Sequence, residues 1–143
     1  MVDSRSWTQK MADIQAAAHS LACADVLDIE FTNGERREVY VATTSESRSQ
    51  GLAHQLELAV DGMLFVYETP SYVPFTATEM QFDMDIAWYD HTGKILRRLN
   101  VPAGDRTALF SPSAFSYVLE TTSGNLPEAN LKVTIGVMGR LFG

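Results

Sequence analysis

Acidic side chains that could bind a cation or exchange protons are concentrated in one stretch of the chain, residues 57–90. This stretch contains no lysine or arginine, and its acids are Glu57, Asp61, Glu68, Glu79, Asp83, Asp85 and Asp90. Carboxylate oxygens are the ligands that hard cations prefer, so Glu79, Asp83 and Asp85 are candidates for a divalent metal. On a strand, Asp83 and Asp85 would also point to the same face, as a paired acid and base requires. The spacing lacks the pattern of a calcium loop, and nothing in the sequence supplies a substrate groove, so we predict a solvated acidic surface, no metal and no cofactor.

Residues that could act as nucleophiles or bases do not form a catalytic set. Cys23 lies among small residues in a helical segment, where a cysteine usually packs as a small hydrophobe. His19, His54 and His91 are far apart in the sequence, and none of them belongs to a metal-binding pair. A nucleophile elbow and a phosphate-binding glycine loop are also missing. We therefore predict no catalytic residue and a protein that is not an enzyme.

The composition is that of one globular domain of ordinary make-up. The chain has 143 residues, 45% of them hydrophobic, which is enough to form a core without disulfides. Its 11 lysines and arginines against 18 acids give a formal net charge of −7, which disfavours nucleic acid as a partner. The sequence has no run of about 18 apolar residues, so we expect no membrane span. The segment before Cys23 contains Asp13, Gln15 and His19 and is too polar for an export signal, so we expect a cytoplasmic or virion location.

The N-terminal segment has the periodicity of an amphipathic helix. Apolar residues recur at steps of four, three, four and three, and they are Trp7, Met11, Ile14, Ala18 and Leu21. This spacing predicts a helix over residues 4–22. The apolar stripe can pack on the core of its own domain or serve as a partner-binding arm. We accordingly divide the chain into a helix or attachment arm at residues 1–24 and a single domain at residues 25–143.

From Val26 onward the apolar residues alternate with polar ones, which is typical of strands. Asn33-Gly34 predicts a tight hairpin turn between strands at residues 27–31 and 38–41. Thr43 and Glu46 have the spacing of a capping box, which predicts a short helix over residues 44–50. Further strands are predicted at residues 62–67, 75–80, 84–89, 95–101, 115–121 and 131–138, with a loop at 70–74. We expect a mainly β (α+β) fold, a compact and mostly antiparallel barrel-like or sandwich-like domain with an N-terminal amphipathic helix and one short internal helix.

Four motifs follow one another along this β region. Gly51-Leu52 comes first, Gly62-Met63-Leu64-Phe65-Val66-Tyr67 is the most specific, Met84-Asp85-Ile86 leads to Asp90 and Gly93, and Tyr117-Val118-Leu119-Glu120 is last. With these motifs, residues 39–124 resemble the mostly prokaryotic family catalogued as domain of unknown function 192 (DUF192). The resemblance implies a compact, mostly antiparallel β-structure. It implies no activity, because none is established for the family.

The chain departs from the family pattern at its polar signature strand. Where the family has Phe-Trp-Met-Lys-Asn-Thr, this sequence has Phe75-Thr76-Ala77-Thr78-Glu79-Met80. A site that holds an anion with the family's lysine could not work here, where Thr78 stands at the position of the lysine and the acid Glu79 is beside it. We therefore carry over the fold of the family and no site residue.

Basic and apolar residues near the C-terminal half point to contacts with other proteins. Lys94, Arg97, Arg98 and Arg106 follow the acidic stretch and are accompanied only by Asp105. Complementary charged patches of this kind can set the register between protein partners. The terminal Leu141 and Phe142 are apolar and would be buried in the fold or against a neighbour.

Two functional hypotheses follow from these features. The preferred one is a non-enzymatic structural or interaction module, an acidic homo-oligomer or subunit of a larger assembly such as a phage head, tail or capsid-decorating accessory protein. Its partner-binding residues would be Trp7, Met11, Ile14, Leu21, Arg97, Arg98, Leu141 and Phe142. The alternative is a small-ligand-binding domain or a cryptic enzyme of the DUF192 family. Its ligand-binding residues would be Phe75, Thr78, Glu79, Asp85 and Tyr117.

Overall fold

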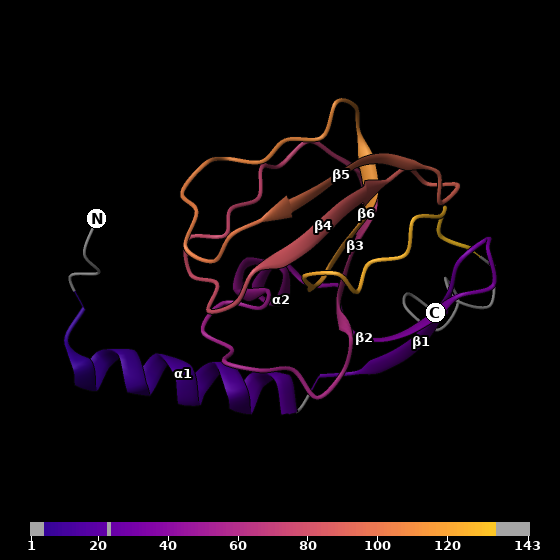
Figure 1. Ribbon diagram of the computed structural model, residues 1–143. Coiled ribbons are helices and arrows are strands. Elements are labelled where there is room, and N and C mark those ends of the chain that lie inside the picture. Colours follow the sequence, from indigo (N-terminus) through magenta and orange to yellow (C-terminus); the bar gives the residue numbers. More distant parts are fainter. Residues whose placement is uncertain (1–4, 23, 134–143) are drawn as a thin grey trace.

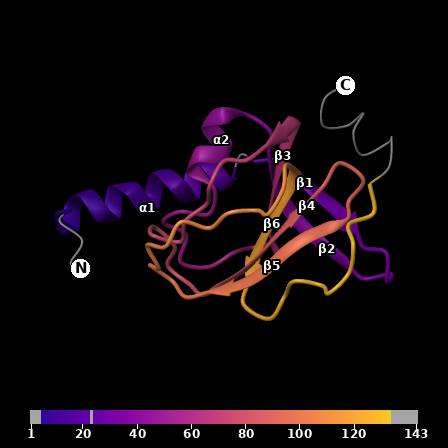
Figure 2. The same cartoon turned by 90° about the horizontal axis from the view of Figure 1, so that it is seen from above.

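The structure is a computed structural model, and it describes residues 5–22 and 24–133. The described part contains two helices and six strands, and the strands form one sheet with both helices on the same side (Figures 1 and 2). The elements are α1 (Trp7–Ala22), β1 (Val26–Glu30), β2 (Arg36–Ala42), α2 (Ser45–Gln50), β3 (Gly62–Ser71), β4 (Met84–Tyr89), β5 (Ile95–Val101) and β6 (Phe115–Thr122). The predicted mainly β fold with an N-terminal helix and one short internal helix is confirmed.

The strands lie in the order β1-β2-β3-β6-β4-β5. β2 and β3 are parallel, and the other neighbouring pairs are antiparallel, as expected for a mostly antiparallel domain. β1 and β5 lie at opposite edges of the sheet, so the described strands form an open sheet and do not close into a barrel. β6 comes last in the chain but lies between β3 and β4, which places its side chains at the centre of the sheet.

The first hairpin forms where Asn33-Gly34 predicts it. Gly34 has a φ of 90°, a conformation that a side chain disfavours, and its N–H donates to the Phe31 carbonyl at 2.9 Å. The Asn33 side-chain oxygen accepts a hydrogen bond from the Glu35 N–H at 3.0 Å. This turn pairs β1 with β2 so that Ile29 lies opposite Arg37.

The short helix α2 begins one residue later than the sequence predicts. Thr44 is its N-cap, and the Thr44 hydroxyl accepts a hydrogen bond from the Ser47 N–H at 3.1 Å. The Ser47 hydroxyl in turn accepts from the Thr44 N–H at 3.1 Å. The capping box is therefore Thr44 with Ser47, and the predicted pair Thr43 with Glu46 is wrong because the helix begins one residue later and Thr44 is its N-cap.

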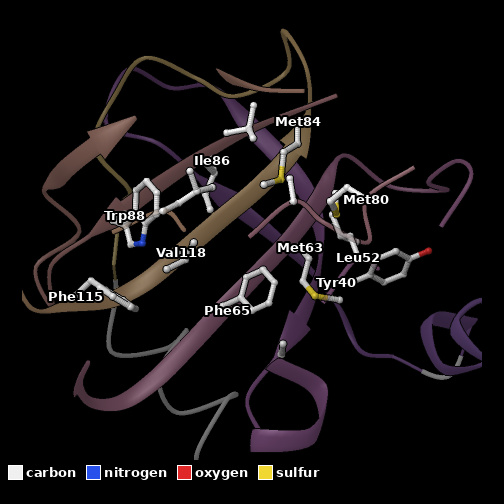
Figure 3. Packing of buried hydrophobic residues seen from close by; sticks show 14 of the residues in the cluster. Tyr40, Leu52, Met63, Phe65, Met80, Met84, Ile86, Trp88, Phe115 and Val118 are labelled. Carbon is white, nitrogen blue, oxygen red and sulfur yellow. The ribbon is translucent and has the colours of Figure 1, made fainter. Parts of the chain in front are cut away.

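Apolar side chains cover both faces of the sheet, because the strand residues alternate between the faces. The face toward the helices carries the cluster drawn in Figure 3, which includes Met63, Phe65, Ile86, Trp88 and Val118. The opposite face carries a second cluster, which includes Leu64, Val66, Ala87, Tyr89 and Leu119. The alternation along β6 assigns Glu120 to the helix side, together with Val118.

The motif glycine Gly62 is required by the close approach of two strands. Gly62 lies opposite Thr121 in the β3–β6 pair. A Cβ atom at this position would overlap the backbone carbonyl oxygen of Glu120. Only glycine therefore lets β3 and β6 pair at this register.

Residues 75–80 form a loop, so the predicted strand there is wrong. Phe75 makes a single bridge with Leu109, and no longer ladder follows. The Thr76 hydroxyl accepts a hydrogen bond from the Thr78 N–H at 3.2 Å, and the Met80 N–H donates to the Ala77 carbonyl at 3.0 Å. These local bonds turn the chain, because threonine side chains compete with strand partners for the backbone.

Two other predictions, the loop at 70–74 and the final strand at 131–138, also differ from the structure. β3 continues to Ser71, so only the last part of the expected loop at 70–74 lies outside a strand. Leu131 makes one bridge with Phe31, and residues 132–133 are not in a strand. Residues 134–138 of the predicted final strand lie outside the described residues.

Candidate functional site

A cavity of about 420 Å³ opens on the helix side of the sheet, within the roughly 300–1,000 Å³ range that small-molecule sites occupy. Its walls come from α2 and the residues that follow it, from β3 and from the loop at 73–80. Glu120 of the central strand β6 also lines it. Four separate parts of the chain thus meet around one space.

Glu120 is the most unusual residue of this cavity. Its side chain is on the central strand between Met63 of β3 and Ile86 of β4, and the residue is only 3% exposed. Among the described residues its carboxyl group has no hydrogen bond or ion pair. Burial raises the pKa of Glu120 to about 8, so the carboxyl is mostly neutral at pH 7. A buried carboxyl that no partner compensates is costly to the fold, and such groups are concentrated at functional sites.

Aromatic rings form one wall of the cavity. Phe65 and Phe75 both line it, and they meet edge to face with their ring centres 5.2 Å apart. Phe75 also contacts the buried Trp88 edge to face, at 6.3 Å between ring centres. The Phe75 ring therefore links the cavity to the core shown in Figure 3, where Trp88 and Phe65 are labelled.

Arg48 of α2 places a positive charge on the wall of the cavity. One of its guanidinium nitrogens, Nη1, donates to the Thr43 carbonyl at 2.6 Å and to the Val66 carbonyl at 3.0 Å. The guanidinium lies over the ring of Tyr67, 4.6 Å from the ring centre, which is a cation–π contact. Arg48 thus fixes α2 to the end of β2 and to β3. Burial raises the pKa of the Tyr67 hydroxyl, so the ring next to Arg48 is neutral at physiological pH.

Glu79 lies on the rim of the cavity, where side chains from two other segments approach its carboxylate. The Arg5 guanidinium is 3.2 Å from its carboxylate, and the His54 ring is 3.6 Å away. Arg5 also pairs with Asp13 of α1 at 2.6 Å. Hydrogen bonds from the Gln9 side chain and from Arg5 lower the pKa of Asp13. These contacts bring the start of α1 to the rim of the cavity.

The structure separates the ligand-binding residues predicted from the sequence into two groups. Phe75 and Glu79 line the cavity, and Thr78 contacts the lining residue Thr76 through their hydroxyls at 2.7 Å. Asp85 and Tyr117 lie on the opposite face of the sheet, because they occupy the other phase of the strand alternation. There Asp85 accepts hydrogen bonds from the Asn100 side chain at 2.8 Å and from the Gly124 N–H at 2.9 Å, as a structural carboxylate does.

The prediction from sequence did not single out Glu120 or Arg48 as site residues. The signal for Glu120 was present: Val118 and Glu120 share a face of a strand whose neighbours are apolar. An acid in the inward phase of a central strand has to be explained by a partner or a function. The strand order that makes β6 central could not be read from the local pattern.

The residues predicted to bind partners lie in different surroundings. Leu21 is buried in the core of its own domain, Met11 and Ile14 are half-buried, and Trp7 is 75% exposed. Arg97 donates to the Phe110 carbonyl at 2.7 Å. Arg98 donates to Glu128 at 3.0 Å and is 3.9 Å from Asp85. Leu141 and Phe142 lie outside the described residues. Whether any of these residues binds a partner stays a prediction.

Metal ligation was one alternative for the acidic stretch. Within residues 5–22 and 24–133, no group of three or more histidine, cysteine, aspartate and glutamate side chains is arranged to hold a metal ion. Asp83 instead accepts a hydrogen bond from the Ala103 N–H at 2.9 Å, and Glu79 faces Arg5.

No helix of the described part is both long and apolar enough to cross a membrane.

These features define a class of protein, a domain with an open mixed sheet that carries a ligand-sized cavity over a buried carboxyl. The chain belongs to the DUF192 family, described as uncharacterized ACR, whose family model matches residues 28–137. The match spans more than half of the chain and confirms the resemblance seen in its motifs.

Two solved structures have a similar fold. One, from Sinorhizobium meliloti 1021 and provisionally assigned as a transcription regulator, has a TM-score of 0.63 and 21% identity, over 73% of this chain and 89% of that one. The other is a protein of unknown function from Novosphingobium aromaticivorans, with a TM-score of 0.61 and 23% identity, over 82% of this chain and 78% of that one. At these identities the likeness concerns the fold alone. The search of curated proteins gave no significant match.

Proposed function

We propose that this chain is a small-molecule-binding domain and that the ligand occupies the cavity between α2, β3 and the loop at 73–80. The observation that carries the proposal is Glu120, a buried carboxyl on the cavity wall for which the described residues provide no partner. A bound ligand would supply the missing partner, while Phe65 and Phe75 would contact its apolar part.

The alternative explanation, that Glu120 only supports the fold, is less satisfactory. Its strand neighbours Met63 and Ile86 are apolar, so an aliphatic residue would pack there without the desolvation penalty. Asp85 shows how this chain treats a structural acid, since both of its carboxylate oxygens accept hydrogen bonds. Glu120 differs from it in having no such bond among the described residues, and this difference supports a ligand-directed role.

We propose binding in preference to catalysis because of what lines the cavity. The described lining residues include Ser45 and Ser49 but no histidine or cysteine. The usual pairing of a nucleophile with a histidine base therefore has no candidate on this wall.

The test is a screen of a small-molecule library against the protein with Trp7 replaced by phenylalanine. This change leaves Trp88, which contacts the cavity residue Phe75, as the one tryptophan of the chain. A ligand in the cavity should change the emission of Trp88 and shift the NMR signals of residues 48–53 and 65–67. Glu120→Gln should weaken the same ligand.

Glu68→Gln is the matched control, because Glu68 is an exposed acid on the neighbouring strand β3 and its replacement makes the same change from a carboxyl to an amide. Hits that are insensitive to Glu120→Gln, or that shift signals only outside the cavity, would contradict the proposal.

A protein-interaction role is the second candidate, and the exposed Trp7 favours it. Trp7 is 75% exposed at the start of α1, and an exposed tryptophan is a frequent anchor of interfaces. The more specific assignment to a homo-oligomer or a phage head, tail or capsid accessory protein remains a prediction from the sequence. Light scattering at low and high salt tests association, with Trp7→Ser as the variant because it leaves the buried Leu21 in place. A monomer at every salt concentration, unchanged by Trp7→Ser, would rule out self-association through this helix.

A further inference from the structure

We propose that the ligand of this cavity is an organic amine whose cationic nitrogen binds the Glu120 carboxylate and whose apolar part lies along Phe65 and Phe75. This inference rests on the proposed function and names the class of ligand. The apolar strand neighbours of Glu120 and the aromatic wall of the cavity support it.

The immediate strand neighbours of Glu120 provide no partner for its carboxyl, so a partner would have to come from the cavity. The adjacent residues on β3 and β4 are Met63 and Ile86, which cannot donate a hydrogen bond. An ionised carboxylate only accepts hydrogen bonds, so its complement is a donor that also carries positive charge. A protonated amine meets both requirements, whereas a neutral alcohol meets one and a carboxylate ligand meets neither.

Among the other charged and titratable groups around the cavity, the carboxylate of Glu79 favours a cationic ligand, and the guanidinium of Arg48 opposes one. Arg48 faces it from α2, Tyr67 from β3 and Glu79 from the loop at 73–80. Arg48 already donates through Nη1 to two backbone carbonyls and lies over Tyr67, which makes it a structural clamp. Glu79 adds a second carboxylate, although the Arg5 guanidinium partly neutralises it. The chain as a whole carries a net charge of −7, which attracts cations and repels acids.

The aromatic wall provides the second half of the recognition. The rings of Phe65 and Phe75 line the cavity, and faces of aromatic rings attract an ammonium group. The same chain already uses this attraction where the Arg48 guanidinium lies over the ring of Tyr67. Aromatic rings and a carboxyl on the wall of one cavity thus fit an amine attached to a small apolar or aromatic body.

Binding requires a proton to leave the protein. In the free protein near neutral pH the Glu120 carboxyl is mostly protonated, because burial raises its pKa to about 8. When the ammonium binds, Glu120 ionises and its proton passes to the buffer, so one proton is released for each ligand bound. As the pH is raised toward the pKa of Glu120, the affinity should therefore increase roughly tenfold for each pH unit. Above that pKa the affinity should level off.

The experiment compares benzylamine with two analogues of the same size, benzyl alcohol and benzoate, by isothermal titration calorimetry of the full chain. We expect benzylamine to bind most tightly, with an affinity that rises with pH and a binding heat that depends on the buffer because a proton is released. Glu120→Gln should weaken benzylamine by roughly tenfold to a hundredfold, as the loss of a charged hydrogen bond does. Glu68→Gln should leave it unchanged. The pH dependence of the unmodified protein gives a readout that does not depend on the folding of a variant.

Several outcomes would overturn the inference. They are benzoate or benzyl alcohol binding more tightly than benzylamine, benzylamine binding without proton release, equal binding by Glu120→Gln, or no binding of benzylamine at millimolar concentrations. A failure of the amine class can be distinguished from a failure of the proposed function. If a neutral or acidic compound binds in the cavity in a way that depends on Glu120, the binding role stands and only the amine class is wrong.

Discussion

Glu120→Gln is expected to make the protein more stable at neutral and alkaline pH, although it removes a residue of the family motif. The native carboxyl has a pKa of about 8, against the ordinary value of 4.5 that applies in the unfolded chain. Below the ordinary value both states are protonated, and Glu120 contributes nothing to the pH dependence of folding. Above it the unfolded chain ionises while the native state keeps its proton, so the free energy of unfolding falls as pH rises.

The magnitude follows from the difference between the two pKa values. A raised pKa corresponds to about 1.4 kcal/mol per unit, so the full loss approaches roughly 5 kcal/mol once the pH exceeds that of the buried group. Most of this change falls between the two pKa values, and the part between about pH 6 and pH 8 amounts to about 2 kcal/mol. For a domain of this size, that difference lowers the melting temperature by roughly 5–10 °C. The amide of glutamine does not ionise, so the variant should lack this component.

The assay is urea unfolding followed by circular dichroism at several pH values between about 6 and 9, for the wild type, Glu120→Gln and Glu68→Gln. Other groups titrate in this range, but they titrate in all three proteins, so the difference between the curves isolates Glu120. The free energy of unfolding of the wild type and of Glu68→Gln should fall with pH more steeply than that of Glu120→Gln. Parallel curves for the wild type and Glu120→Gln would refute the claim that this carboxyl is buried without a partner.

Three further changes test other parts of the structure. Gly62→Ala should destabilise the protein by more than about 3 kcal/mol in urea unfolding, because a Cβ there overlaps the Glu120 carbonyl; a small effect would contradict the close approach of β3 and β6. Phe75→Ala should cost about 2–3 kcal/mol and shift the emission of Trp88, since the two rings touch; an unchanged spectrum would contradict that contact. Glu79→Gln should change the free energy of unfolding by less than about 1 kcal/mol, because the ion pair between Glu79 and Arg5 is partly exposed. The same change should speed amide exchange at the start of α1. Equal exchange rates in the wild type and the variant would mean that Glu79 does not hold the helix.

Local signals in the sequence were sufficient to locate most of the elements. The alternation of apolar and polar residues gave the positions of β1, β4, β5 and β6, and Asn33-Gly34 gave the first hairpin. The stripe that starts at Trp7 gave α1. Such signals depend on residues a few positions apart, which makes them readable without the fold. The exception at residues 75–80 has a local cause as well, because Thr76 bonds to the backbone of Thr78 and turns the chain.

The candidate site was less accessible to prediction, as the two acids Glu120 and Asp85 illustrate. Asp85 was a predicted ligand-binding residue, and the structure places it on the face opposite the cavity among hydrogen-bond donors. Glu120 was noted only as the end of a motif, and the structure places it in the cavity. Both lie on strands, and the sequence shows that each occupies one phase of an alternation. It does not show which phase faces the helices.

The sequence by itself determined the family, the mainly β class and the position of most elements, because these properties follow from motifs and short-range periodicity. The tertiary structure decided the site, because β6 inserts between β3 and β4 and brings Glu120 beneath a wall built by α2 and the loop at 73–80. Strand order depends on contacts between residues distant in the chain, and burial of a carboxyl depends on everything that packs around it. Neither is encoded in the neighbourhood of one residue, and for this reason the cavity and its unpartnered acid emerged only from the folded chain.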